Sequence, residues 1–293
     1  MAQIAIVGPG AIGSVVAAWL AHTARHEVIL CARRPLGDLR VDTPSGPLGS
    51  RPAVLTDPAR ATPVEWVLVC TKAYDAPGAA AWFDGLVTPR THVAVLQNGV
   101  EHRERFAASL PSGRLLPVMV DIPSERSADG LVRQRGPGRM AVPDDAAGRA
   151  FVALFADTPL DVAVTADFTS TVWRKLCGNS AGILNALLLQ PSGVFRQDAV
   201  AEAARAIVRE CVAVGRAEGA VLDDALPDTV VQGYRNAPPD FVNSIHADRA
   251  AGRPTEVDAR NGVIVRLGQK HGIPTPCNQM AVALLEAMTQ AAR

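Results

Sequence analysis

The sequence predicts an α/β domain followed by an all-α domain, and three observations lead to this fold class. A short apolar strand at residues 4–7 runs directly into a glycine-rich turn and then into an apolar helix. Strands and helices alternate from there to residue 165, which is typical of a mainly parallel sheet. Beyond that point the apolar residues follow helical periodicity alone. We therefore divide the chain into residues 1–165 and residues 166–293.

The glycine-rich turn has the spacing G-x-G-x-x-G and is predicted to bind a dinucleotide. The three glycines allow a tight turn, close approach of the backbone to a pyrophosphate, and close packing of helix against strand. The helix that follows offers free N–H groups and a positive dipole end to the phosphates. The spacing alone is weak evidence, and a simple strand-to-helix turn is the alternative, but the flanking strand and helix supply the required context. The predicted cofactor contacts here are Gly8, Pro9, Gly10, Ala11, Ile12 and Gly13.

Composition and charge narrow the class of protein. At 293 residues the chain is long enough for two domains, each with its own core. The formal charge is zero, so nothing favours binding to nucleic acid or to an anionic membrane. No stretch approaches the roughly 20 uninterrupted apolar residues of a membrane span, and the first strand leaves no room for a signal peptide. The five cysteines are scattered, which predicts a reducing, cytoplasmic location without disulfides or a metal site.

The second strand, at residues 27–31, predicts which dinucleotide binds. In folds that bind NAD, a carboxylate usually follows this strand and contacts the ribose 2′-hydroxyl. This chain instead carries Arg33 and Arg34. Two guanidinium groups suit a 2′-phosphate, which they can hold by charge-assisted hydrogen bonds. We therefore predict NADP(H) as the cofactor, with a solvated arginine pair as the alternative.

Two further strands of the first domain end in polar residues at the expected ligand edge. Lys72 follows a strand at residues 66–70, and Asn98 follows a strand at residues 92–96. Strand carboxyl ends face the ligand crevice in an open α/β sheet, so both side chains are candidates for cofactor contact. For Asn98 a simple Asn-Gly turn is an equal alternative. The other predicted elements are short strands or a loop at 40–54, strands at 115–121, 131–135, 140–142 and 160–165, and helices at 14–21, 79–83 and 146–156.

Lysine is rare in this chain, and each lysine therefore needs an explanation. Of the 29 basic residues 26 are arginine, and the lysines are Lys72, Lys175 and Lys270. A buried lysine can release its proton near neutral pH, whereas an arginine cannot. Lys270 lies in a polar Gln-Lys-His-Gly turn, and chance survival of a rare residue explains it best. We predict functional roles for the other two.

The second domain is predicted to be helical, and its first long helix carries the leading catalytic candidate. Lys175 and Asn179 are four residues apart, so they share one face of an otherwise apolar helix. Buried polar groups need partners, and a substrate that bears a carbonyl group is one such partner. A solvated surface stripe is the alternative. The predicted helices span residues 170–189, 199–218, 240–251, 255–270 and 278–292.

Polar residues also gather where two later helices begin. Asn243 and Ser244 open one helix, and Glu256 and Asp258 lie in the first turn of the next. On the residues alone, the two carboxylates are better explained as groups that stabilise the helix N-terminus.

Taken together and in order, these motifs resemble the ketopantoate reductase (2-dehydropantoate 2-reductase) family over nearly the whole chain. The resemblance implies a Rossmann domain followed by an all-α domain similar to the C-terminal domain of 6-phosphogluconate dehydrogenase, with NADPH between them. The matching segments are Gly8-Pro9-Gly10-Ala11-Ile12-Gly13, Thr71-Lys72-Ala73-Tyr74-Asp75, Gln97-Asn98-Gly99-Val100, Trp173-Arg174-Lys175-Leu176 with Asn179, Ser244 with Asp248, Thr255-Glu256-Val257-Asp258, Asn261-Gly262 and His271-Gly272-Ile273-Pro274.

The resemblance also implies roles for single residues. The proton donor is implied to be Lys175, and Glu256 is implied to face the active site, which revises its interpretation as a capping group. We take these two residues as the catalytic pair. The implied cofactor contacts outside the glycine-rich turn are Arg33 or Arg34 at the 2′-phosphate, Lys72 and Asn98, and the predicted substrate contacts are Lys175, Asn179, Asn243 and Ser244.

The chain departs from the family pattern in the substrate contacts. Family members that reduce ketopantoate usually carry a second substrate-binding asparagine one helical turn beyond the first. Here the region from Ala181 to Asn185 is one residue shorter, which displaces Asn185 from the expected face. A later Pro-Asn-Gly of the family is replaced by Pro191-Ser192-Gly193. The identity of the substrate therefore stays open, while the reaction type is better defined.

The sequence thus predicts an NADP-dependent oxidoreductase that reduces a 2-oxo acid to a 2-hydroxy acid, with ketopantoate as the best single choice. One alternative is reductive condensation of an amine with a 2-oxo acid, as in opine dehydrogenases, but the catalytic His–Asp pair of that class is not found. Another alternative is a protein that senses NADPH without turning it over. Lys175 argues against a sensor, which needs no proton donor. We predict a small-molecule partner only, and a homodimer stays open.

Overall fold

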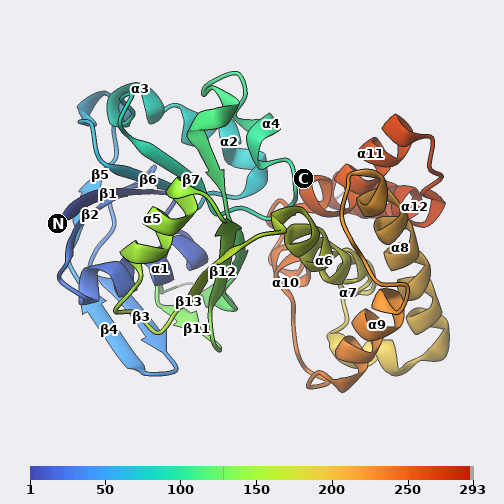
Figure 1. Cartoon of the computed structure of the whole chain (residues 1–293). Helices are drawn as coiled ribbons and strands as arrows, with labels where there is room; N and C mark the ends of the chain where they lie inside the picture. The colour runs from blue at the N-terminus through green and yellow to red at the C-terminus, as the bar shows by residue number, and fades with distance from the viewer. Residues whose placement is uncertain (128, 291–293) are drawn as a thin grey trace. The chain divides into compact units, whose positions relative to one another are not determined.

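The computed structural model describes residues 1–127 and 129–290, which form two compact units (Figure 1). The first unit comprises Met1–Gln97 and His102–Phe168. The second comprises Asn98–Glu101 and the chain from Thr169 onward. The division after Phe168 falls close to the predicted boundary at residue 165. The sequence did not indicate that Asn98–Glu101 would group with the helical unit.

The first unit is built on a six-stranded parallel sheet, which confirms the predicted fold class. Its strand order is the 3-2-1-4-5-6 order of Rossmann folds. Val7 lies in register with Cys31 on one side and with Val69 on the other, so three strands end at the same edge. That edge carries the glycine-rich turn, the arginine pair and the segment with Lys72. In sheet order the strands are β5 (Ala53–Leu55), β2 (His26–Cys31), β1 (Ala2–Val7), β6 (Trp66–Val69), β7 (His92–Val95) and β8 (Leu115–Pro117).

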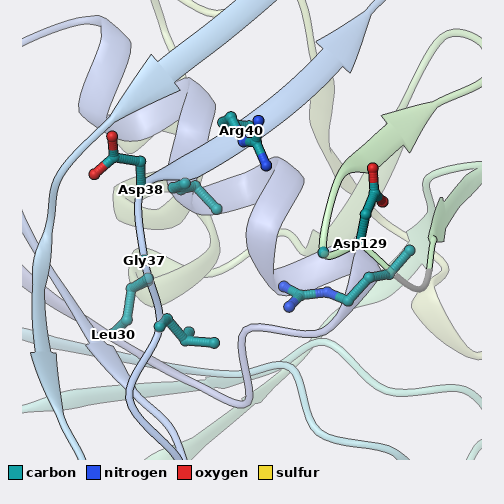
Figure 2. A pocket seen from close by; sticks show the side chains of 9 residues that line it. Leu30, Gly37, Asp38, Arg40 and Asp129 are labelled. Carbon is teal, nitrogen blue, oxygen red and sulfur yellow. The ribbon is translucent and has the colours of Figure 1, made fainter.

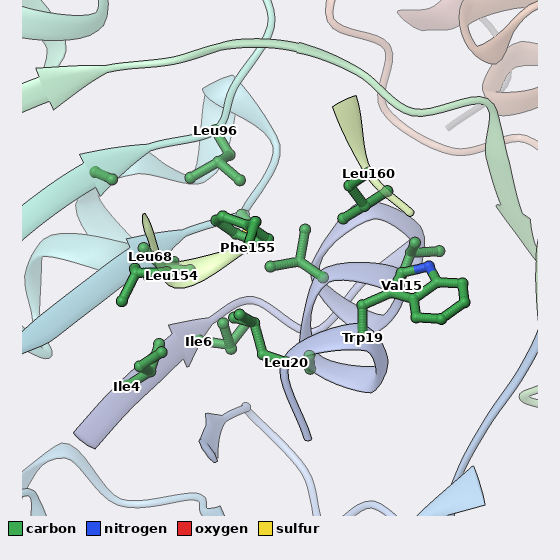
Figure 3. Close-up of a cluster of buried hydrophobic side chains, with 14 of the residues drawn as sticks. Ile4, Ile6, Val15, Trp19, Leu20, Leu68, Leu96, Leu154, Phe155 and Leu160 are labelled. Atoms are coloured by element: carbon green, nitrogen blue, oxygen red, sulfur yellow. The ribbon is translucent and has the colours of Figure 1, made fainter. Parts of the chain in front are cut away.

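Both faces of this sheet are buried, because successive side chains of a strand point to opposite faces. Ile4 and Ile6 of β1 share one core cluster with Trp19 of α1 (Ala11–His22), as Figure 3 shows. Val7 belongs to a second cluster, which contains residues of the helices on the other face. The continuous apolar run of β1 is therefore explained by burial on both sides.

Smaller sheets and short helices complete the first unit. The predicted short strands in 40–54 exist, and β3 (Leu39–Thr43) pairs with β4 (Gly46–Ser50) in a four-stranded sheet. The strands β10 (Ser124–Arg126) and β11 (Val132–Gln134) belong to that sheet, and β9 (Met119–Asp121), β12 (Arg139–Pro143) and β13 (Asp161–Thr165) form a three-stranded one. The helices are η1 (Pro58–Arg60), η2 (Ala73–Asp75), α2 (Ala76–Ala80), α3 (Phe83–Leu86), α4 (His102–Arg105), η3 (Ser112–Arg114) and α5 (Ala146–Leu154).

The described residues of the second unit form helices joined by turns and loops, without a strand, as predicted. The short helix at Ser192–Arg196 was not predicted, and the longer helices differ from the prediction in three places. The expected helix at 170–189 is broken at Gly182, and the helix at Leu226–Asn236 was not predicted. A π-helical turn occupies Asp258–Gly262, inside the expected helix at 255–270. Residues 291 and 292, the predicted end of the last helix, lie outside the described residues. The helices are α6 (Phe168–Ala181), α7 (Ile183–Leu188), η4 (Ser192–Arg196), α8 (Asp198–Ala217), α9 (Leu226–Asn236), α10 (Ser244–Ala250), η5 (Asp258–Gly262), α11 (Val263–His271) and α12 (Pro276–Gln290).

A buried amide network fixes the π-helical turn within the second unit. Asn261 is fully buried, and its Nδ2 donates to the carbonyl oxygen of Ser180 at 3.1 Å and to Oδ1 of Asn278 at 2.9 Å. Asn278 in turn donates to Oε2 of Glu210 at 2.7 Å. Buried polar groups joined in this way fix one arrangement of their elements. The network therefore holds η5, α8 and α12 in place around α6.

Candidate active site

The glycine-rich turn leaves its backbone open where a pyrophosphate would lie. Gly8 has a φ of +86°, and a Cβ there would lie 2.5 Å from Cγ2 of Thr71. A Cβ on Gly13 would lie 2.5 Å from the carbonyl oxygen of Gly8, so this glycine permits close packing of α1 on β1. At Gly10, in contrast, no atom lies within 4 Å of the Cβ position. The first turn of α1 has no side-chain cap, so its N–H groups can meet an anion. These residues fit a bound dinucleotide.

Arg33 and Arg34 are exposed at the same edge of the sheet, directly after β2. Nη1 of Arg33 lies 3.8 Å from Oδ2 of Asp75, whose segment follows β6. Such a long, exposed ion pair contributes little by itself, so Arg33 can turn toward an anionic ligand at small cost. Lys72 lies between these groups and the end of β7, and its carbonyl oxygen accepts from Nε2 of Gln97 at 3.4 Å. The predicted 2′-phosphate contacts Arg33 and Arg34 and the predicted cofactor contact Lys72 thus follow strands that end at the same edge of the sheet.

Arg126 supports the glycine-rich turn, although nothing in the sequence singles it out. Its Nη2 donates to the carbonyl oxygen of Pro9 at 2.5 Å and to Oγ of Ser14 at 2.6 Å. Burial lowers the pKa of this guanidinium from its ordinary value. Arg126 also lines an open hollow of about 370 Å³, whose other walls include Leu30 and Arg40 (Figure 2). A contact between residues so far apart in sequence has no local pattern by which to predict it.

Lys175, Asn98 and Glu256 form a hydrogen-bonded series within the second unit. Nζ of Lys175 donates to Oδ1 of Asn98 at 3.1 Å, and Nδ2 of Asn98 donates to Oε2 of Glu256 at 3.0 Å. Because an ammonium can only donate and a carboxylate can only accept, this series fixes the orientation of the amide. Glu256 is buried, whereas Lys175 and Asn98 are half-buried. The two residues predicted as the catalytic pair are thus joined by Asn98, for which the sequence predicted a cofactor contact.

The predicted substrate contacts lie beside a buried arginine that the sequence analysis missed. Asn179 lies one turn after Lys175 on α6, and Ser244 is the first residue of α10. Arg260, in the π-helical turn, donates from Nη2 to the carbonyl oxygen of Asn179 at 2.6 Å. Its Nη1 lies 3.5 Å from Oγ of Ser244. An arginine is usually a surface residue, so the position of Arg260 gave no signal of burial.

His246 lies on α10, two residues after Ser244. It is buried, and its Nδ1 has no hydrogen-bond partner in the described residues. Burial, with a smaller effect of Arg249, lowers the pKa of His246 below its ordinary value. The imidazole is therefore neutral near pH 7, which makes it a poor rival to Lys175 as a proton donor.

Comparison with known proteins places this geometry in a family. The family described as "Ketopantoate reductase PanE/ApbA" matches residues 4–146, and the one described as "Ketopantoate reductase PanE/ApbA C terminal" matches residues 167–289. The chain belongs to the ketopantoate reductase family. It is 54% identical to a 2-dehydropantoate 2-reductase of Caulobacter vibrioides, over 98% of this chain and 99% of that one. A 2-dehydropantoate 2-reductase of Mycobacterium tuberculosis is 41% identical over 97% of both chains.

Solved structures agree with this family. The crystal structure of a PanE/ApbA family ketopantoate reductase from Ralstonia eutropha JMP134 superposes with a TM-score of 0.90 over 99% of both chains, at 31% identity. The protein is therefore an oxidoreductase of a family that depends on NAD(H) or NADP(H).

The departure from the ketopantoate reductase pattern after Asn179 has a structural explanation. A Cβ on Gly182 would lie 2.6 Å from Nδ2 of Asn243, 2.7 Å from the hydroxyl of Tyr234 and 3.2 Å from Nη2 of Arg260. No side chain fits there without moving these groups. The glycine therefore makes room for polar side chains from three other helices.

Asn185 and Asn243 both have structural roles in this family member. Nδ2 of Asn185 donates to the carbonyl oxygen of Gln190 at 2.9 Å, and this contact helps to end α7. Asn243 is the N-cap of α10, since its side chain accepts from the backbone N–H of His246. Both of its amide N–H groups are used, one to Oδ1 of Asn185 and one to the carbonyl oxygen of Gly182. Its predicted substrate contact stays a prediction, and Ser244 is the better placed of the two.

The part of the chain that the structure describes contains neither a cluster of metal ligands nor a membrane-spanning helix. No group of three or more histidine, cysteine or acidic side chains in residues 1–127 and 129–290 is arranged to hold a metal ion. Within the same residues, no helix has the length and apolar character needed to cross a membrane.

Proposed function

We propose that the protein reduces ketopantoate to pantoate with NADPH. The observation that carries the proposal is the hydrogen-bonded series of Lys175, Asn98 and Glu256, next to Asn179 and Ser244. An ammonium group, amides and a hydroxyl are the groups that a 2-oxo acid needs for binding and for protonation of its carbonyl oxygen. The choice of ketopantoate follows the names of the relatives described above.

The reaction adds a hydride and a proton across the ketone of the substrate. NADPH, when bound, supplies the hydride to the ketone carbon. Lys175 donates a proton to the carbonyl oxygen, which becomes the hydroxyl group of the product, and the lysine is left as a neutral amine, which water reprotonates. Asn98 accepts from Lys175 and holds Nζ in place, while Glu256 fixes the amide of Asn98. Asn179 and Ser244 hold the substrate during the transfer.

The choice of NADPH over NADH rests on Arg33 and Arg34. No carboxylate follows β2 where an enzyme that prefers NADH would use one for the ribose 2′-hydroxyl. The open backbone at Gly10 and the uncapped start of α1 would hold the pyrophosphate. We also place the reaction in the cytoplasm, because the five cysteines are free thiols. A homodimer stays a prediction that sedimentation would test.

A screen of NADPH oxidation across 2-oxo acids tests the function. Ketopantoate is compared with 2-oxoisovalerate, which lacks its hydroxyl group, and with an amine plus a 2-oxo acid. We expect steady oxidation of NADPH with ketopantoate and none that requires the amine. Binding of NADPH without oxidation by any 2-oxo acid would instead identify a sensor.

A second candidate substrate has one observation in its favour. Asn185, the only asparagine between Ala181 and Pro191, is used within the protein and is not available to anchor a hydroxyl group. A 2-oxo acid without that hydroxyl would lose less here than in a family member with both asparagines. Faster turnover of 2-oxoisovalerate than of ketopantoate in the same screen would establish this second candidate.

A further inference from the structure

Arg260 is a buried arginine that has more N–H groups than its neighbours have acceptors for them. Its exposed fraction is 2%, and its Nε has no hydrogen-bond partner in the described residues. Its two other nitrogens reach one carbonyl oxygen, of Asn179, and one hydroxyl, of Ser244. A guanidinium carries five N–H groups. Because Asn179 and Ser244 are the proposed substrate contacts, these donors lie where a substrate would bind.

Among the described residues, no carboxylate forms an ion pair with Arg260. Asp248 and Glu256 attract its charge from a distance, but within the described part of the chain Arg260 forms no ion pair. Oδ1 of Asp248 accepts from Arg253 at 3.0 Å, and Oε2 of Glu256 accepts from Asn98. Burial lowers the pKa of Arg260, yet an arginine stays protonated near pH 7. A buried cation without a paired anion is unfavourable, so an anionic ligand would be bound favourably beside it.

The position of Arg260 also accounts for the altered substrate contacts. Its Nη2 lies 3.2 Å from the place that a Cβ on Gly182 would take, one turn beyond Asn179 on the same stretch of chain. A second substrate asparagine is expected near this position in the family. In this chain the polar groups near that place come from other segments than α6, and Arg260 of η5 is the charged one among them.

We propose that Arg260 supplies the positive charge that selects 2-oxo acids by their carboxylate group, acting through the hydroxyl of Ser244. This inference rests on the proposed function. Oγ of Ser244 accepts from Arg260, so its own O–H is left to donate to a carboxylate oxygen. Ser244 is exposed, whereas Arg260 is buried behind it, so the serine meets the substrate and the arginine is a positioning residue. The positive charge of Arg260 polarises this hydroxyl and so strengthens its contact with a carboxylate oxygen.

The test compares a charged substrate with an uncharged one. We measure kcat/KM for 2-oxoisovalerate and for its methyl ester, which cannot close to a lactone because it has no hydroxyl group. For a protein that requires the hydroxyl, ketopantoate and its uncharged lactone form the equivalent pair. In the unmodified enzyme we expect the acid to be preferred by at least about tenfold.

Arg260→Met should lower kcat/KM for the acid about ten- to a hundredfold and change that for the ester by less than about threefold. Arg260→Lys, which keeps the charge, should keep most of the preference for the acid. Arg209→Met is the matched control, since it removes an exposed arginine of the same unit, which pairs with Glu202 on α8; it should leave the ratio of acid to ester unchanged.

Two results would overturn the inference while the proposed function stands. The first is an equal loss for acid and ester in Arg260→Met, which would mean that Arg260 only supports the end of α6. The second is an unmodified enzyme that shows no preference for the acid, a result that needs no variant and so does not depend on whether Arg260→Met folds. An enzyme that oxidises NADPH with no 2-oxo acid at all would overturn the proposed function, and this inference with it.

Discussion

Replacing Lys175 by methionine should slow the chemical step far more than it weakens NADPH binding. The variant keeps most of the side-chain volume on α6 but removes Nζ, and with it the hydrogen bond of 3.1 Å to Oδ1 of Asn98. A positioned general acid contributes about 10²–10⁴-fold to a rate, which corresponds to roughly 2.7–5.5 kcal/mol of activation free energy. We expect kcat to fall within this range.

Two further variants separate the three contributions of Lys175, which are its proton, its positive charge and the position of its Nζ. Lys175→Arg keeps a positive charge but cannot readily release a proton, so it should restore little of the lost kcat. Asn98→Ala leaves the ammonium in place but removes the groups that hold it, and should cost kcat less than Lys175→Met. Arg174→Met is the matched control, because this arginine is the exposed neighbour of Lys175 on the same helix.

The assay is NADPH oxidation under single-turnover conditions, with NADPH affinity measured separately by its fluorescence on binding. Single turnover is needed because product release can otherwise hide a slower chemical step. A Lys175→Met enzyme within about tenfold of the unmodified protein would refute the assignment of Lys175 as the acid. Equal losses in Lys175→Met and Arg174→Met would point to damage to α6 as a whole.

Three other predictions follow from the structure. Changing Arg33 and Arg34 together to alanine should raise KM for NADPH about ten- to a hundredfold and leave KM for NADH nearly unchanged; an unmodified protein that prefers NADH would contradict this. Gly10→Ala should fold with a nearly unchanged melting temperature but bind NADPH poorly. Gly13→Ala should lose about 1–3 kcal/mol of stability, because its Cβ would meet the backbone oxygen of Gly8. Equal melting temperatures for the two variants would disprove the packing argument. Hydrogen bonds, above all from Lys270, lower the pKa of Glu218. The contribution of Glu218 to stability is therefore present above the ordinary glutamate pKa and is lost as the pH falls through the pKa of the folded state. Glu218→Gln should lower the melting temperature at pH 7, and a decrease of the same size at pH 3 would contradict this argument.

The first domain could be predicted well because its signals are local. The strand at residues 4–7 is apolar without interruption, and the three glycines that follow have a spacing that can be recognised within a few residues. Parallel strands end at a common edge, so Lys72 and the arginine pair could be placed without knowing any contact. Arg126 escaped prediction because its partners, Pro9 and Ser14, lie more than a hundred residues away.

The helical unit was harder to predict where a helix departs from a regular pattern. The α9 helix contains Pro227 near its start and Gly233 inside it, and both residues favour a loop when only the sequence is considered. Proline is nevertheless well tolerated in the first turn of a helix. The sequence predicts a continuous helix through Gly182, but the helix is interrupted there. The crowding at its Cβ position, which excludes a side chain, comes from residues that lie far away in the sequence. The cofactor contact of Asn98 stays a prediction that rests on its place after β7, whereas its hydrogen bonds to Lys175 and Glu256 had no local signal because those partners lie far away in the sequence.

The π-helical turn at Asp258–Gly262 lies within the segment that the sequence predicts as a regular helix, and it carries Arg260 of the proposed site. A helix with regular spacing would present residues 256 and 260 on one face, four positions apart. In the structure Glu256 precedes the π-helical turn and accepts from Asn98, whereas Arg260 lies inside the turn and donates to Asn179 and Ser244, and the buried amide of Asn261 anchors the turn. π-helical turns of this kind are found frequently at functional sites. On the roles proposed above, a change in this one segment would alter both the recognition of the substrate's carboxylate and, through Asn98, the orientation of Lys175.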